Sequence, residues 1–223
     1  MGPLTEDRRD RLARVRLYLV TGERGDPGET LAIVAAALAG GADAIQLRKK
    51  AMAKDELVRL GLRVRALTRA HGALFIMNDH PDLAIATDAD GVHVGQDDFP
   101  PAMIRSLHGF DGRLVGRSTH SIEQAERAVA DGVDYIGVGP VFATPTKPGR
   151  PAVGTDLVRE VAGKVELPFV AIGGIDLANA AGVIEAGARA IAVVRAVYDA
   201  DDPQSMARQL RQLVDTRSGA LTA

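Results

Sequence analysis

The chain has 223 residues, of which 46% are hydrophobic, so it can bury a substantial core in one or two domains. Its net charge of −2 excludes a bulk electrostatic attraction to nucleic acid or to an anionic membrane, and any anion site must be local. The absence of cysteine excludes disulfides and thiolate metal sites. Neither a signal peptide nor an apolar run long enough to span a bilayer is evident, which fits a cytoplasmic protein.

Short apolar runs alternate with amphipathic segments along the chain. Residues 1–16 form a charged lead-in segment. The expected strands cover residues 17–20, 44–47, 74–77, 92–94, 114–116, 135–138, 169–172 and 190–194. The expected helices cover residues 30–39, 54–70, 81–86, 101–107, 121–130, 157–161, 177–185 and 204–214. Residues 216–223 are expected to form a disordered tail.

Eight strand–helix units in succession favour an α/β fold, a single (β/α)8 TIM barrel over residues 17–215. Several of the strands are continuous apolar runs, as expected where both faces of a parallel sheet are covered. An open doubly wound sheet would instead need a glycine-rich turn after the first strand. That position holds T-G-E-R at 21–24, which is a poor nucleotide fingerprint.

A polar and cationic group follows the second expected strand. Period-two alternation puts the side chains of Gln46, Arg48 and Lys50 on one side of an extended chain. The carboxyl ends of the strands form the active-site face of such a barrel, so these donors indicate a phosphate or pyrophosphate site. A solvated basic turn explains the spacing equally well.

Acidic residues follow the third and fourth expected strands. Asp79 comes after the third strand, and Asp97 and Asp98 come after the fourth. Because neighbouring strands end side by side, we expect Asp79 to lie close to one of the other two. Two carboxylates beside cations suit a Mg²⁺ ion that arrives with substrate phosphates. Taken singly, each aspartate is better explained as a cap of the following helix, since Pro81 and Pro100 mark helix starts.

Four further connections carry groups that bear on function. Ser118 and His120 follow the fifth strand, but without an acidic partner they make a poor nucleophile and base. Residues 172–176 and 193–196 form the loops that commonly hold phosphate in such barrels. The connection over residues 137–154 is long, proline-stiffened and carries Lys147, and such connections are more often functional than short turns.

The layout predicts two separate anion sites at one barrel mouth. One is cationic and metal-assisted, after strands two to four, and the other is a nest of backbone N–H groups after strands seven and eight. Two phosphorylated substrates, one with a pyrophosphate leaving group, fit this layout. An isomerase that acts on one small phosphate would not need the first site.

The ordered set of motifs resembles the thiamine-phosphate synthase family. The motifs are L-V-T at 19–21, I-Q-L-R-K-K at 45–50, M-N-D at 77–79, D-G-V-H-V-G-Q-D-D at 90–98, G-V-G-P-V-F-A-T-P-T-K at 137–147 and A-I-G-G-I at 171–175. The resemblance implies a Mg²⁺-dependent transferase that joins hydroxymethylpyrimidine diphosphate to a thiazole phosphate, giving thiamine phosphate and pyrophosphate. It implies small-molecule substrates, no nucleic-acid or membrane partner, and leaves a homo-oligomer open.

The resemblance also implies roles by position. The catalytic residues it implies are Arg48, Lys50, Lys147 and Ser118, and the implied Mg²⁺ ligands are Asp79 and Asp98. Asp98 is chosen over Asp97 because the family's G-Q-x-D pattern has its metal aspartate second. The implied substrate-binding residues are Gln46, Arg48, Lys50, Asn78, Ser118, Thr144, Thr146, Lys147, Gly174, Val194 and Arg195.

Two residues depart from the family pattern. Lys49 stands where the family often has an acidic residue, which is expected to make the loop more basic, and Arg195 stands where serine is frequent. The family mechanism implies that pyrophosphate dissociates to leave a pyrimidine-stabilised carbocation, which needs no strong general base. Two alternatives are a related isomerase of a thiazole carboxylate phosphate and a catalytically silent phosphate-binding barrel.

Overall fold

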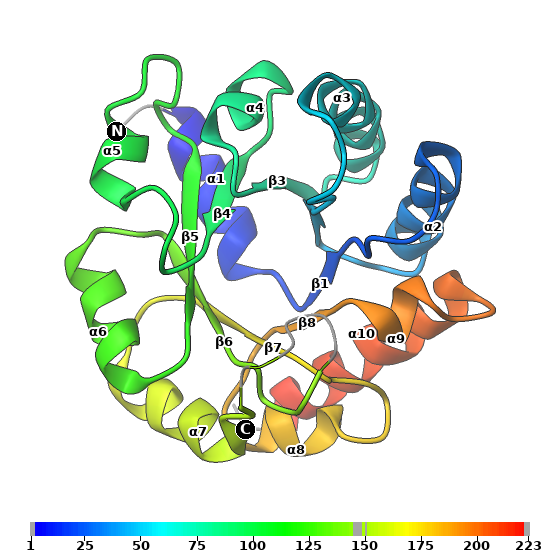
Figure 1. Cartoon of the computed structure of the whole chain (residues 1–223). Helices are drawn as coiled ribbons and strands as arrows, with labels where there is room; N and C mark the ends of the chain where they lie inside the picture. The colour runs from blue at the N-terminus through cyan, green and yellow to red at the C-terminus, as the bar shows by residue number, and fades with distance from the viewer. Residues whose placement is uncertain (1–2, 145–148, 150, 221–223) are drawn as a thin grey trace.

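The computed structural model describes residues 3–144, 149 and 151–220, and these form a closed barrel of parallel strands with helices outside it (Figure 1). Each strand pairs with the next in chain order, and β8 closes the barrel against β1. The predicted (β/α)8 fold is confirmed. In the described part of the chain, no helix is both long and apolar enough to cross a membrane.

The strands and helices alternate along the chain after an initial helix. The strands are β1 (Leu17–Val20), β2 (Ala44–Leu47), β3 (Leu74–Asn78), β4 (Gly91–Val94), β5 (Leu114–Thr119), β6 (Tyr135–Val138), β7 (Phe169–Ile172) and β8 (Ile191–Val193). The helices are α1 (Pro3–Ala13), α2 (Pro27–Ala39), α3 (Lys54–Ala70), α4 (Pro81–Ala86), α5 (Pro101–Arg105), α6 (Ile122–Ala130), α7 (Gly154–Lys164), α8 (Ala180–Glu185), α9 (Arg195–Tyr198) and α10 (Pro203–Ala220).

The structure corrects the expected elements at a few places. The disordered tail expected from residue 216 is wrong as far as Ala220, because α10 continues to that residue, while residues 221–223 lie outside the described ranges. Helix α2 begins at Pro27 rather than at residue 30, since the Asp26 side chain accepts a hydrogen bond from the N–H of Glu29 and caps the helix there. The short helix α9 was not expected.

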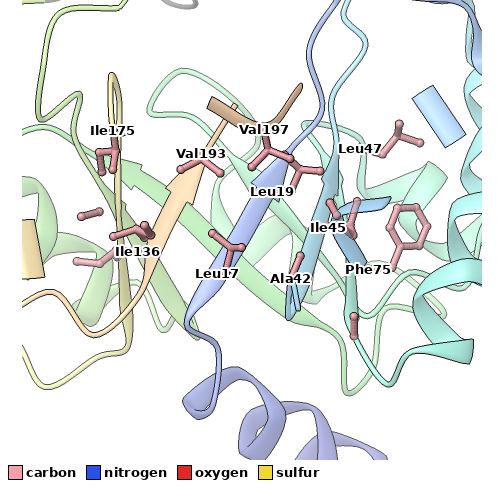
Figure 2. Close-up of a cluster of buried hydrophobic side chains, with 14 of the residues drawn as sticks. Leu17, Leu19, Ala42, Ile45, Leu47, Phe75, Ile136, Ile175, Val193 and Val197 are labelled. Carbon is pink, nitrogen blue, oxygen red and sulfur yellow. The ribbon is translucent and has the colours of Figure 1, made fainter. Parts of the chain in front are cut away.

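Alternation along the strands divides the core into two layers. Leu17 and Leu19 of β1 pack outward against the helices, in a cluster with Ile45 and Val193 (Figure 2). Tyr18, between them, points into the barrel and packs with Leu74, Leu114 and Tyr135, among other residues. The barrel interior is therefore a packed core, and the space for ligands lies above it, at the carboxyl ends of the strands.

Helix α1 lies across the amino ends of the strands, below β1 in Figure 2, and arginines fix it there. The guanidinium of Arg8 contacts Asp90, with Nε 3.2 Å from Oδ1, and the guanidinium of Arg9 contacts Asp134 at 2.8 Å. Asp90 also accepts hydrogen bonds from Arg65 and from the N–H of Phe75. The lead-in segment therefore covers the amino-terminal end of the barrel, away from the carboxyl ends of the strands.

Asp90→Ala is expected to destabilise the fold by about 3–5 kcal/mol, since it leaves buried guanidinium charge without its partner. The Asp90 side chain is only 1% exposed and Arg65 13%. Urea unfolding followed by circular dichroism measures the change. Asp55→Ala, which removes an exposed i,i+4 pair with Arg59, is the control and should cost less than about 0.5 kcal/mol. A small effect at Asp90 would mean that neighbouring groups rearrange to solvate Arg65.

Candidate active site

Two adjoining cavities open at the carboxyl ends of the strands. The first, here the β2–β4 cavity, has a volume of about 370 Å³ and is lined by residues that include Gln46, Arg48, Lys50, Asn78, Asp79, His93, Gln96, Asp97 and Asp98. The second, the β7–β8 cavity, has a volume of about 330 Å³ and is lined by residues that include Thr144, Gly173, Gly174, Asp176, Arg195 and Ala196. Both cavities are lined by Ser118, Gly137, Ile172, Ala192 and Val194.

The end of β2 sends alternate side chains to opposite sides, as expected from its extended backbone. Gln46, Arg48 and Lys50 line the β2–β4 cavity. Lys49 points the other way and is 5% exposed, with its Nζ 2.6 Å from the carbonyl oxygen of Arg24 and 3.1 Å from the hydroxyl of Tyr198. Lys49 therefore holds the β1–α2 connection, and the expectation that it makes the anion loop more basic is wrong.

The cations of the β2–β4 cavity are neutralised by carboxylates of the chain itself. Glu23 lies on Arg48, with Nη1 2.8 Å from Oε1, and it accepts two hydrogen bonds from the backbone N–H of Lys50 at 3.0 and 3.2 Å. The ammonium group of Lys50 is 3.1 Å from Oδ2 of Asp79. Glu23 therefore occupies donors that suit an anionic ligand, a contact that was not predicted from the sequence.

Neither candidate metal aspartate caps the helix that follows it. Asp79 has a φ of 62°, in the left-handed region that aspartate tolerates, and α4 begins after His80 without a side-chain cap. Asp98 accepts a hydrogen bond from the N–H of Gly95 at 2.6 Å, and α5 begins after Pro100 without a side-chain cap. The helix-cap alternative is therefore wrong for both aspartates.

The carboxylates fit a magnesium ion only as part of a larger ligand set. Among the described residues, no three histidine or acidic side chains are grouped as a metal centre. Asp79 and Asp98 nonetheless line the same cavity as Arg48 and Lys50. Two carboxylates with water and phosphate oxygens make the donor set that Mg²⁺ prefers when it binds with a phosphorylated substrate. The residues present fit such an ion.

A glycine turn forms part of the wall of the β7–β8 cavity. Gly173 and Gly174 have φ values of 108° and 65°, and a Cβ atom on Gly174 would lie 2.8 Å from the Cβ of Phe142. The side-chain amide of Asn179 donates to the carbonyl oxygen of Gly174 at 2.8 Å and fixes this turn. Val194 and Arg195 line the facing wall, where the first N–H groups of a helix have no intrahelical acceptor. This wall offers N–H donors to an anion.

The connection after β6 contributes Gly139, Pro140 and the candidate Thr144 to the wall of the β7–β8 cavity. Thr146 and Lys147, two further candidates on this connection, lie outside the described residues. Of the other candidates, Asn78 lies in the β2–β4 cavity and Ser118 lies where the two cavities meet. The structure thus brings the described candidates to one end of the barrel in the two expected groups.

Ser118 has a histidine partner, but it is not the neighbouring His120. The Nδ1 atom of His120 is hydrogen-bonded to the carbonyl oxygen of Gly139. Ser118 Oγ instead lies 3.0 Å from Nε2 of His93, which comes from β4. Sequence reasoning missed His93 as a site residue, although its position on β4 two residues before Gly95 puts it on the inner face near the strand end.

Two buried tyrosines continue from His93 into the barrel and were also missed. The hydroxyl of Tyr135 is 3.1 Å from His93 Nδ1 and 3.0 Å from the hydroxyl of Tyr18. Burial raises the pKa of both tyrosines well above the ordinary value, so both remain O–H donors at neutral pH. The available signal was alternation, which turns Tyr18 to the same side of β1 as Val20.

The fold and the cavities define the class of the protein as a (β/α)8 barrel with two adjoining cavities at the carboxyl ends of its strands, the end at which barrel enzymes carry their active sites. The sequence matches the thiamine monophosphate synthase family over residues 17–197. The chain belongs to this family, and the predicted family and the predicted transferase class are confirmed.

Relatives and solved structures agree with this assignment. The chain is 52% identical to the thiamine-phosphate synthase of Thermus thermophilus, over 88% of this chain and 96% of that protein. It is 52% identical to the thiamine-phosphate synthase of Gloeobacter violaceus over 88% of this chain, but only 57% of that longer protein. The structure of thiamine phosphate pyrophosphorylase from Pyrococcus furiosus has a TM-score of 0.84 at 36% identity, covering 94% of this chain and 98% of that one.

Proposed function

We propose that this chain transfers the hydroxymethylpyrimidine group from its diphosphate to a thiazole phosphate, giving thiamine phosphate and pyrophosphate. The observation that carries the proposal is the pair of adjoining cavities with Ser118 on their common wall. One cavity holds cations and carboxylates, as a diphosphate donor and its metal require. The other offers backbone donors, as a single phosphate requires.

In this proposal the β2–β4 cavity binds the diphosphate donor. Arg48 and Lys50 neutralise the departing pyrophosphate, with Lys147 as a third cation, and Gln46, Asn78 and Ser118 bind the donor beside them. Asp79 and Asp98 would hold Mg²⁺, which supplies further charge neutralisation at the phosphate oxygens. Asp79 contacts the ammonium group of Lys50 in the structure, and in the metal-binding role it would leave that group to the phosphate.

The β7–β8 cavity binds the acceptor. Gly174, Val194 and Arg195 would hold its phosphate through N–H groups, and Thr144 and Thr146 add hydroxyl donors. Arg195, where serine is frequent, adds a guanidinium to this wall. The C–O bond to pyrophosphate breaks first and leaves the pyrimidine carbocation. The thiazole nitrogen, held beside the shared wall, then forms the new C–N bond to that carbocation. Positioning and charge neutralisation carry such a reaction, which needs no strong general base.

A coupling assay with both substrates and Mg²⁺ tests the proposal. Formation of thiamine phosphate and pyrophosphate in equal amounts is the expected result. An isomerase of a thiazole carboxylate phosphate would convert the acceptor without any diphosphate donor, and a silent phosphate-binding barrel would bind either substrate without product. Either of these outcomes with well-folded protein overturns the synthase proposal.

Glu23→Ala is expected to tighten the binding of inorganic pyrophosphate about three- to tenfold, because a carboxylate that competes for Arg48 is removed. Isothermal titration calorimetry with Mg²⁺ present measures the change. Glu29→Ala is the matched control, since Glu29 pairs with Arg24 on the β1–α2 connection and, among the described residues, makes no hydrogen bond or ion pair with Arg48 or Lys50. Weaker binding in the Glu23 variant would mean that Glu23 orients Arg48 for the ligand.

A further inference from the structure

A continuous chain of hydrogen bonds crosses the barrel interior beneath the β2–β4 cavity. It starts at Gln46, whose Nε2 donates to the Tyr18 hydroxyl at 2.9 Å, and it passes to the Tyr135 hydroxyl at 3.0 Å. From there it reaches His93 Nδ1 at 3.1 Å, and His93 Nε2 lies 3.0 Å from Ser118 Oγ. This hydrogen-bonded chain therefore joins two candidate substrate-binding residues, one on β2 and one on β5.

Counting the available hydrogen-bond donors shows which partner donates in each bond of this hydrogen-bonded chain. In the described structure the Tyr18 hydroxyl has two hydrogen-bond neighbours, the Gln46 amide nitrogen and the Tyr135 hydroxyl. The amide nitrogen can only donate, so Tyr18 must give its own proton to Tyr135. The alternative would leave the fully buried O–H group of Tyr18 without an acceptor, which is unfavourable. Tyr135, having accepted from Tyr18, has His93 Nδ1 as its acceptor.

The donor-to-acceptor direction of these hydrogen bonds also fixes which ring nitrogen of His93 carries the proton and where the Ser118 hydroxyl points. Because Nδ1 of His93 accepts from Tyr135, a neutral ring carries its proton on Nε2 and donates to Ser118. The Ser118 hydroxyl proton is then directed away from His93 and into the space where the two cavities meet. At the other end, the Gln46 amide gives one of its two N–H groups to Tyr18, and with the nitrogen held there the carbonyl oxygen is left to accept from a ligand.

Two glycines make the space that this chain needs. A Cβ atom on Gly116 would lie 2.2 Å from Cζ of Tyr135, and one on Gly137 would lie 3.3 Å from Cε1 of His93. Contacts below 3 Å require a shift, so any larger residue at Gly116 would push the Tyr135 ring out of line. Glycine at these two positions of β5 and β6 therefore leaves the room that the Tyr135 and His93 rings occupy.

We propose that Tyr18, Tyr135 and His93 are positioning residues, which fix Ser118 as a hydrogen-bond donor and Gln46 as an acceptor toward the donor substrate. A ring held between these two side chains needs an N–H group facing Gln46 and a ring nitrogen facing Ser118. An amino-substituted pyrimidine has both groups, whereas a pyrimidine with an oxo group and a ring N–H at those places has them reversed. The inference rests on the proposed function for its ligand, but not for the direction of the chain.

The opposite direction would give the same residues another role. With its proton on Nδ1, His93 would accept from the Ser118 hydroxyl, as a general base does beside a serine nucleophile. The tautomer of His93 therefore distinguishes a pair that orients a substrate from a pair that activates a nucleophile. Nitrogen-15 NMR of the imidazole rings measures the tautomer directly and requires neither substrate nor metal.

In the unaltered protein we expect the His93 signal, assigned by its loss in His93→Gln, to show the proton on Nε2. In Tyr135→Phe the acceptor nitrogen loses its donor, and the Nδ1–H form should become populated. Tyr198→Phe is the matched control, because it removes another buried tyrosine hydroxyl that lies outside the chain. An Nδ1–H tautomer in the unaltered protein, or no change in Tyr135→Phe, overturns the inference.

Kinetics provide a second test. Tyr135→Phe should raise KM for the pyrimidine diphosphate about tenfold, the size expected for a misdirected buried hydrogen bond, with KM for the thiazole phosphate unchanged. His93→Gln, which can still accept from Tyr135 and donate to Ser118, should retain more affinity for the pyrimidine diphosphate than His93→Leu. Equal losses in the two variants, or an equal rise in both KM values, would reduce the role of the chain to structural support.

Failure of the inference differs from failure of the proposed function. If the coupling assay gives no product, the NMR measurement still decides the direction of the chain. If product forms and Tyr135→Phe leaves both the tautomer and KM for the pyrimidine diphosphate unchanged, the function stands and the positioning role does not.

Discussion

Arg48→Ala is expected to lower kcat by about two orders of magnitude or more, the size typical of a group that stabilises charge developing in a transition state. The Arg48 side chain is 11% exposed and lines the β2–β4 cavity, where its guanidinium is held against Glu23. In the proposed reaction, a fixed and partly desolvated cation would need little reorganisation to neutralise the departing pyrophosphate. Steady-state assay of pyrophosphate release with both substrates saturating measures the effect.

Two comparisons isolate the charge of Arg48 from the stability of the fold. Arg59→Ala removes an exposed arginine from α3 and should leave kcat unchanged. Arg48→Lys keeps the charge but loses the planar fork that binds two oxygens, so it should fall between Arg48→Ala and the unaltered enzyme. If Arg48→Ala turns over nearly as fast as the unaltered enzyme, the assignment of pyrophosphate to the β2–β4 cavity is wrong.

Much of the fold follows from local rules and was predicted from the sequence. The strands are short apolar runs at regular spacing, and every described strand pairs with its neighbour in chain order. The same alternation that puts Gln46, Arg48 and Lys50 along one cavity also explains why Lys49 leaves it. An adjacent lysine in the sequence says nothing about charge at the site unless its side of the strand is considered.

The interactions that were not predicted join residues distant in sequence. Glu23 and Arg48 are brought together by the register of β1 on β2, where Val20 pairs with Gln46, and by the conformation of the connection that follows β1. Tyr18 and Tyr135 meet across the barrel because each is long enough to reach its centre. Side-chain length and rotamer decide such contacts, and neither follows from apolar periodicity.

The choice of Asp98 over Asp97 as a Mg²⁺ ligand can be tested by the Mg²⁺ dependence of activity. Asp97 and Asp98 both line the β2–β4 cavity, so the structure alone leaves both available to a cation. Asp98→Ala is expected to raise the Mg²⁺ concentration for half-maximal activity by at least about tenfold, since even outer-shell changes typically cost that much metal affinity. Asp97→Ala makes the same change in net charge one residue away and should have a smaller effect.

Asp98 also holds its own turn, and a second variant separates this role from metal binding. The Asp98 carboxylate accepts from the N–H of Gly95 at 2.6 Å, and the amide oxygen of Asp98→Asn can still accept that hydrogen bond. If Asp98 is a metal ligand, Asp98→Asn should lose Mg²⁺ affinity nearly as Asp98→Ala does, because the charge is gone although the turn remains. If Asp98→Asn instead keeps the Mg²⁺ dependence of the unaltered enzyme, Asp98 acts only on the turn. A larger loss in Asp97→Ala would move the metal ligand by one residue.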